Sequence, residues 1–312
     1  MKNNYNELII SSGGTKGIAL VGALNELIKY YPLKNIQYYT GCSIGSIICL
    51  LLNINYSISE MNDIIMKINF ENFQDLKILN LLEKCGLDEG TKFTNFLKAV
   101  IINKNISPSI TFQELYEKSN KVLTIVVTNI TKGIPEYHNY INTPNLSILL
   151  SLRMSSNIPI VFSPIFYNEN YYIDGALLDP FPYFYHKNTI KCGICLFDKY
   201  EFNFLNNQIV NFINHIDDSF KYIIELIKIM HVNYIKKFYK KILKNVIYID
   251  FDFHSINIDT FEVSIEDKNK MFKIGINKCN SFFNKLFKKN RKKYLSRKYL
   301  NIWLEIHKNL KM

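Results

Sequence analysis

The feature that most constrains this chain is the pentapeptide Gly-Cys-Ser-Ile-Gly at 41–45, which lies between two apolar segments. Residues 36–40 have the pattern of a β-strand and residues 44–52 that of a helix, so Ser43 falls at a strand–helix junction. A serine on such a sharp turn projects its hydroxyl above the sheet, and glycines on both sides avoid clashes in the turn. The helix that follows presents its N-terminus to developing negative charge. The motif therefore predicts a nucleophilic serine at position 43.

Strand and helix patterns alternate along the first half of the chain. Strands are predicted at 7–11, 36–40 and 123–128, and helices at 16–30 and 44–52. This alternation is typical of an α/β fold with a mainly parallel central sheet and helices on both faces. The patterns further along predict a mainly helical stretch at 57–118 with a turn at 86–90, a helix at 147–156, a hairpin at 165–173, strands at 189–197 and 245–252, and helices at 204–244 and from 264 onward.

A second glycine-rich turn, Ser-Gly-Gly-Thr-Lys-Gly at 12–17, also lies between a predicted strand and a predicted helix. A phosphate-binding P-loop is excluded because glycine follows Lys16, and the first half of a dinucleotide-binding loop is not matched. The backbone N–H groups of Gly13 and Gly14 can instead approach a ligand oxygen. An oxyanion hole fits best, since a serine nucleophile requires one. The alternative is a plain turn into a helix.

A third motif, Asp174-Gly175-Ala176, follows the apolar segment 171–173. Asp-Gly alone indicates a turn, so it gains a functional meaning only beside the other two motifs. The chain resembles the patatin-like phospholipase family in the order of its three motifs. These are a glycine-rich turn with a lysine, then Gly-x-Ser-x-Gly, and then Asp-Gly-Ala. The resemblance extends to Thr-Phe-Gln-Glu-Leu at 111–115 and to the serine- and proline-containing stretch at 155–164, and it covers roughly residues 5–285.

The resemblance implies a patatin-like three-layer sandwich and a lipid acyl hydrolase that cleaves fatty-acyl esters of (phospho)glycerolipids through an acyl-enzyme. In such a Ser–Asp dyad enzyme Ser43 would be the nucleophile and Asp174 its general base, with the N–H groups of Gly13 and Gly14 as the oxyanion hole. The residues implied to support these motifs are Thr15, Lys16, Gly17, Gly41, Gly45, Gly175 and Ala176. The chain departs from the family at Ser12, where many members have a third glycine.

The proposed base must differ from an ordinary aspartate, because an exposed carboxyl has a pKa near ~3.9 and is a weak base at neutral pH. Burial against Tyr172 and Ile173 would raise the pKa of Asp174.

We expect no metal ion and no other cofactor. One alternative is a Ser-His-Asp triad esterase or lipase, and another is a non-catalytic basic binding protein. The histidines considered for a triad are His186, His215, His231, His254 and His307.

Basic residues concentrate near the C-terminus. The formal net charge is +11, and much of the excess lies at 285–298 among aromatic and aliphatic residues. We expect an acyl-hydrolase domain at 1–287 and a basic, helical tail at 288–312 that binds an anionic membrane surface. The alternative is a solvated helix that closes the domain. No RNA-binding or helix-turn-helix pattern is present, so nucleic acid is not an expected partner.

The sequence has neither the pattern of a secretory signal nor an apolar run of about 18 residues that could span a membrane. We therefore expect an intracellular protein, cytoplasmic or at the membrane periphery, and six reduced cysteines. Cys192 and Cys195 form a Cys-x-x-Cys pattern. On a strand these two side chains face opposite sides of the sheet, so the pattern is interpreted as structural and not as a redox or zinc site.

Overall fold

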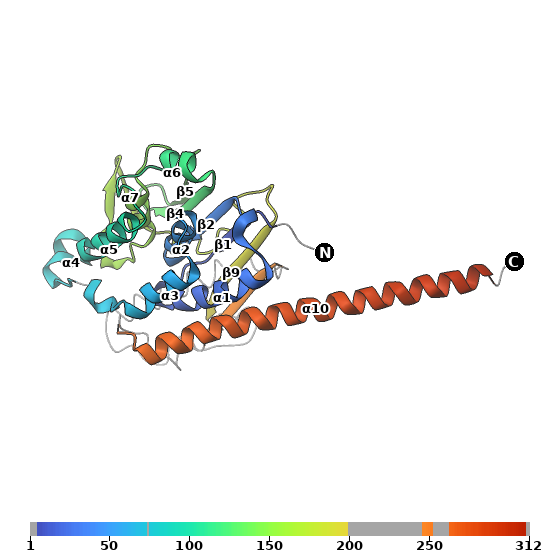
Figure 1. Ribbon diagram of the computed structural model, residues 1–312. Helices are drawn as coiled ribbons and strands as arrows, with labels where there is room; N and C mark the ends of the chain where they lie inside the picture. Colours follow the sequence, from blue (N-terminus) through green and yellow to red (C-terminus); the bar gives the residue numbers. More distant parts are fainter. Residues whose placement is uncertain (1–4, 74, 199–244, 252–261, 310–312) are drawn as a thin grey trace.

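A computed structural model of the chain describes residues 5–73, 75–198, 245–251 and 262–309. The helix predicted at 204–244 lies outside the described residues. In the described part, helices surround a central eight-stranded sheet with strand order β10-β9-β1-β2-β4-β8-β7, and β5 also pairs with β4 (Figure 1). The strands are β1 Glu7–Ile10, β2 Tyr38–Cys42, β3 Gly86–Asp88, β4 Val122–Asn129, β5 Ile134–His138, β6 Ile160–Phe162, β7 Ile165–Tyr167, β8 Asn170–Asp174, β9 Lys191–Asp198 and β10 Val246–Phe251. The helices are α1 Gly17–Tyr30, α2 Ile44–Asn53, α3 Ile58–Lys67, α4 Ile78–Lys84, α5 Thr91–Ile102, α6 Phe112–Ser119, α7 Ile148–Ser155 and α10 Ile265–Asn309.

The central sheet is mixed but mostly parallel. Strands β10, β9, β1, β2 and β4 run parallel to one another, whereas β5, β7 and β8 are antiparallel to their neighbours. Parallel strands lie between two covered faces, which explains why β1 and β4 are buried along their whole length. The predicted α/β fold, with a mainly parallel sheet flanked by helices, is confirmed.

Side chains alternate between the two faces of this sheet. Leu8 and Cys192 join the large apolar core beneath α1, α2, α7 and α10, whereas Ile9 and Cys195 belong to a separate cluster on the opposite face. All four side chains are buried. The two cysteines therefore cannot meet, and the structural interpretation of the Cys-x-x-Cys pattern is confirmed.

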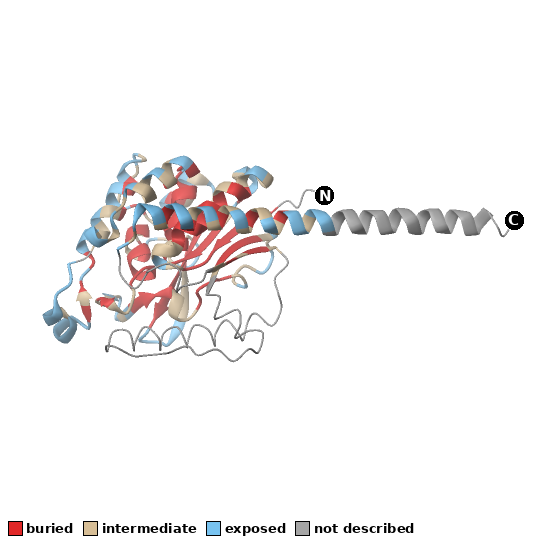
Figure 2. Cartoon of the chain, turned by 90° about the horizontal axis from the view of Figure 1, so that it is seen from below, coloured by how far each residue is buried: buried red, intermediate tan, exposed pale blue. Residues whose placement is uncertain are grey.

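The first part of α10 packs along α1 (Figure 1). Met271, Cys279 and Phe283 are buried there, and the Phe283 ring stacks on Tyr30 with the ring centroids 3.9 Å apart. Figure 2 shows that the buried positions of α10 lie within this packed part. The helix continues without a break to Asn309. The domain boundary expected after residue 287 therefore falls inside one helix and not in a loop.

Two local predictions, the end of the second strand and the turn at 86–90, were wrong for the same physical reason. Both segments pair with strands that are distant in the sequence. Strand β2 extends to Cys42, beyond the predicted end at residue 40, because Gly41 and Cys42 pair with Ile125 and Val126 of β4. The sharp turn is thus confined to Ser43. Similarly, the turn predicted at 86–90 contains strand β3, which pairs in parallel with β6 in a small second sheet.

Candidate active site

Ser43 lies between β2 and α2 in a backbone conformation that is rare for residues other than glycine. Its φ is 53° and its ψ is −125°, and strained positions of this kind cluster at functional sites. The turn is so tight that a Cβ at Gly41 would lie 2.5 Å from the backbone of Gly45, and a Cβ at Gly45 would lie 2.4 Å from the carbonyl oxygen of Ile10. Only glycine fits at both positions, so the Gly-x-Ser-x-Gly spacing is a steric requirement of this turn.

The structure brings Ser43 and Asp174 into direct contact. The Ser43 hydroxyl donates to Oδ2 of Asp174 at 2.7 Å, and the Ala176 N–H donates to Oδ1 at 2.8 Å. The sheet explains this meeting. Strand β2 pairs with β4 as far as Val126, and β8 pairs with β4 in the opposite direction from Val127 onward. The C-terminal ends of β2 and β8 therefore meet beside β4.

Burial changes the acidity of this carboxyl. Asp174 is 5% exposed, and the loss of hydration raises its pKa from 3.8 to about 7. Hydrogen bonds from the Ala176 N–H and the Ser43 hydroxyl favour the ionised form, but they only partly offset the effect of burial. A carboxyl with a pKa near neutrality is matched to accepting and returning a proton at physiological pH.

The end of α7 holds both members of this pair. The Ser155 hydroxyl accepts a hydrogen bond from the Ser43 N–H at 2.9 Å and donates to the Val126 carbonyl oxygen at 2.6 Å. Two residues later, the Asn157 carbonyl oxygen accepts from the Asp174 N–H at 3.0 Å. Sequence reasoning placed 155–164 within a family resemblance but missed these two contacts. The unspecific Ser-Ser-Asn pattern does not indicate which side chain faces the serine turn.

The glycine-rich turn lies beside the serine turn, because β1 and β2 are neighbours with Ile10 opposite Gly41. Gly14 has a φ of 54°, which favours glycine, and the Lys16 N–H donates to the Gly13 carbonyl oxygen at 3.1 Å. Within the described part of the chain, neither the Gly13 N–H nor the Gly14 N–H donates to a backbone carbonyl. The turn thus leaves two adjacent amide donors for a ligand oxygen. The other residues predicted to support this turn follow directly. Thr15 and Lys16 lie in the short 3₁₀ helix Gly14–Lys16, and Gly17 is the first residue of α1.

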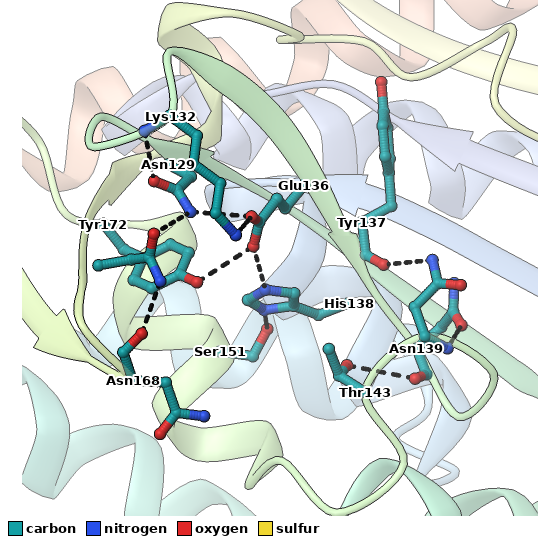
Figure 3. Close-up of polar contacts among 12 residues, drawn as sticks. Asn129, Lys132, Glu136, Tyr137, His138, Asn139, Thr143, Ser151, Asn168 and Tyr172 are labelled. Atoms are coloured by element: carbon teal, nitrogen blue, oxygen red, sulfur yellow. Dashed lines mark hydrogen bonds and ion pairs between the residues drawn. The ribbon is translucent and has the colours of Figure 1, made fainter.

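A second cluster contains a buried serine, a buried histidine and a half-buried carboxylate (Figure 3). His138 Nδ1 lies 3.0 Å from the Ser151 hydroxyl, and His138 Nε2 lies 3.6 Å from a carboxylate oxygen of Glu136. Glu136 also accepts hydrogen bonds from Asn129 at 2.8 Å and from the Tyr172 hydroxyl at 3.1 Å. The 3.6 Å contact with His138 contributes most to lowering the pKa of Glu136 to about 2, so this carboxylate stays ionised.

This cluster was missed by sequence reasoning, because no strand was predicted at 134–138 and His138 was not among the histidines considered. Ser151 lies within α7, fully buried and not on a sharp turn. The cluster therefore has the composition of a catalytic triad, but its serine is not on a strained turn and, in the described part of the chain, no glycine-rich turn lies beside it.

The histidines considered for a triad do not meet the serine in the described part of the chain. His186 lies 3.3 Å from the Thr124 hydroxyl and 4.0 Å from a Glu7 carboxylate oxygen, and burial lowers its pKa to about 4. None of the hydrogen bonds of Ser43 and Asp174 with described residues involves a histidine. Three of the candidates, His215, His231 and His254, lie outside the described residues, as does the side chain of His307.

Comparison with known proteins finds a matching family model and several relatives. The family model of the patatin-like phospholipases matches residues 8–185. A protein of Invertebrate iridescent virus 6, named a probable lipid hydrolase, is 39% identical over 184 residues, which are 57% of this chain and 62% of that protein. The chain thus spans less than two thirds of that relative. A protein of Acanthamoeba polyphaga mimivirus is 27% identical over 88% of this chain and 92% of its own length.

Among solved structures, VipD from Legionella pneumophila has a similar fold, with a TM-score of 0.53 over 90% of this chain and 67% of VipD. The sequence identity to VipD is 17%, so this likeness concerns the fold alone.

Proposed function

The chain belongs to the patatin-like phospholipase family, and from this premise we propose that it is a lipid acyl hydrolase with a Ser43–Asp174 dyad. The observation that carries the proposal is the 2.7 Å hydrogen bond between the Ser43 hydroxyl and a carboxylate whose pKa is raised to about 7. The proposed substrates are fatty-acyl esters of glycerolipids, with phospholipids as the first class to test.

In the proposed reaction Asp174 accepts the proton of the Ser43 hydroxyl while the serine oxygen attacks the ester carbonyl. The N–H groups of Gly13 and Gly14 stabilise the resulting oxyanion, and loss of one such donor typically costs roughly 3 kcal/mol of transition-state stabilisation. Asp174 then returns its proton to the leaving alcohol, which leaves an acyl group on Ser43. Water then loses a proton to Asp174 and attacks the acyl group, and Asp174 returns that proton to the Ser43 oxygen as the bond to the fatty acid breaks.

The C-terminal part is proposed to assist this reaction. In this view residues 1–287 form the acyl-hydrolase domain, and the basic tail at 288–312 binds an anionic membrane through its lysines and arginines. In the described part of the chain, no helix has both the length and the apolar character needed to cross a bilayer. Binding to anionic vesicles with and without residues 288–312 tests the tail, and equal binding would contradict its role.

The proposed function is tested by incubating the purified protein with mixed phospholipids and neutral glycerides and measuring released fatty acids by mass spectrometry. We expect release from at least one glycerolipid class by the wild type and a loss of at least about 10³-fold in Ser43→Ala. Absence of release from every class, with folded protein, would contradict the proposed function.

A further inference from the structure

Helix α4 and the residue two positions before it expose large apolar side chains. The exposed fraction is 52% for Leu76, 79% for Ile78, 71% for Leu79, 37% for Leu81 and 82% for Leu82. No residue of α4 is buried, so this helix contributes no apolar packing to the core. Figure 2 shows it as an exposed projection at the far left. We call Leu76, Ile78, Leu79, Leu81 and Leu82 the α4 patch.

The neighbouring helix shows that this exposure is unusual for the molecule. In α5 the apolar residues Leu97, Val100 and Ile101 are buried, as is normal for an amphipathic helix on a core. Single exposed apolar residues are common on protein surfaces, but a contiguous group on one projection marks an interaction surface. Among the residues that the structure describes, the α4 patch thus stays exposed and can serve as an interaction surface.

The charges around the patch indicate which apolar surface fits. Lys77 pairs with Asp75 at 3.2 Å, and Lys84 pairs with Glu89, so both lysines are neutralised within the protein. Exposed Glu83 leaves a negative charge on the helix itself. A surface with this balance has no attraction for anionic lipid headgroups, but its apolar side chains match the hydrocarbon boundary of a zwitterionic bilayer. This distinguishes the α4 patch from the basic tail.

The patch is connected to the proposed catalytic carboxyl by a short series of contacts. Strand β3 follows α4 and ends at Asp88. The Asp88 carbonyl oxygen accepts a hydrogen bond from the Ser163 N–H at 2.9 Å. The Ser163 carbonyl oxygen accepts from the Asn157 side chain at 2.9 Å, and the Asn157 carbonyl oxygen accepts from the Asp174 N–H. The segment that holds Asp174 is thus linked by hydrogen bonds to the strand that follows α4.

We propose that the α4 patch inserts into the surface of a phospholipid bilayer and docks the protein on the membrane that contains its substrate. The inference rests on the proposed lipid acyl hydrolase function and names the surface on which that site acts. Removing several leucine and isoleucine side chains from water favours reversible attachment without any contribution from charge.

The test measures binding of the full-length chain, with Ser43→Ala to prevent turnover, to phosphatidylcholine vesicles in 0.5 M salt, which screens the basic tail. The variant Ile78→Asn/Leu82→Asn is expected to bind at least about 10-fold more weakly, because it removes the two most exposed side chains of the patch. The matched control is Ile141→Asn/Ile265→Asn, at positions that are 65% and 67% exposed elsewhere, and it should bind like its parent. Equal binding of both double variants would overturn the proposal.

A second measurement separates this inference from the proposed function. With Ser43 restored, the α4 variant should hydrolyse a monomeric short-chain ester within about 2-fold of wild type and vesicular phospholipid at least about 10-fold more slowly. Vesicle binding that depends on α4, in a protein that hydrolyses no ester, would support the docking surface and contradict the proposed function. If the α4 variant lost self-association in solution and kept its vesicle binding, α4 would be an interface between copies, and the inference would be wrong.

Discussion

Ser43 and Ser151 are both buried, and each hydroxyl forms a hydrogen bond to a titratable side chain. Ser43 occupies a strained turn between two glycines and contacts a carboxyl whose pKa is raised to about 7. Ser151 lies within a regular helix and contacts His138, whose other neighbour, Glu136, has its pKa lowered to about 2. The second cluster has the composition of a serine hydrolase triad, but the first has the strained backbone turn and a carboxyl with a raised pKa. Backbone conformation and burial, and not the list of side chains, therefore identify the candidate active site.

The largest expected difference between the two clusters concerns the rate of ester hydrolysis. Asp174→Asn should lower kcat/KM by at least about 10³-fold, because an amide cannot accept the serine proton. His138→Asn should change it by less than about 3-fold when assayed well below its unfolding temperature. The measurement is hydrolysis of a monomeric short-chain ester. The opposite ranking of the two variants would assign catalysis to the histidine-containing cluster.

The two carboxyls should also affect stability with opposite signs. The folded-state pKa of Asp174 is raised, so the unfolded chain loses its proton first and wild-type stability falls between about pH 4 and pH 7. Asp174→Asn should therefore raise the free energy of unfolding by up to about 4 kcal/mol above pH 7, and by little near pH 4.

The pKa of Glu136 is lowered from 4.5 to about 2, so its stabilising effect is complete above about pH 4.5 and is lost as the pH falls toward 2. Glu136→Gln should lower the free energy of unfolding at pH 7 by about 1 kcal/mol, after allowance for solvent screening. Urea unfolding of the wild type and of both variants between pH 2 and about pH 8 measures these changes in the free energy of unfolding. If both substitutions changed the free energy of unfolding in the same direction at pH 7, the environments described for Asp174 and Glu136 would be wrong.

The pH dependence of the rate sharpens the comparison further. If Asp174 is the base, kcat/KM should rise about tenfold per pH unit below 7 and level off above it, giving about a 100-fold difference between pH 5 and pH 8. The raised pKa of Asp174 sets this midpoint. Glu136→Gln should leave the midpoint unchanged. A midpoint near pH 4 would mean that the base is an ordinary exposed carboxyl.

The smallest of these effects concerns the support of the Ser43 turn. Ser155→Ala removes the acceptor of the Ser43 N–H and should lower kcat about 10- to 100-fold with little change in KM, because the nucleophile is misplaced. The neighbouring Ser156→Ala is a matched control, since the buried Ser156 hydroxyl has no hydrogen-bond partner among the residues that the structure describes. Equal losses in both variants would indicate a general packing effect and no specific positioning role.

The sequence predicted the two glycine-rich turns, their place between strands and helices, and the mostly parallel sheet, because these follow from local patterns. The contact between Ser43 and Asp174 was predicted only through the family resemblance. It depends on where β8 joins the sheet, which is a long-range pairing that the local sequence pattern does not encode. The contacts of Ser155 and the His138 cluster were missed because they arise from packing of α7 against β4 and β5. The helical segment at 78–84 was within a predicted helical stretch, but its leucines gave no sign that they would be exposed.

The central claim, that Ser43 is the nucleophile, is tested most directly by labelling the protein with a fluorophosphonate probe and mapping the modified residue by mass spectrometry. The account predicts label on Ser43 in the wild type, no label in Ser43→Ala, and full labelling in Ser151→Ala and His138→Asn. Label on Ser151, or label that persists in Ser43→Ala, would contradict it.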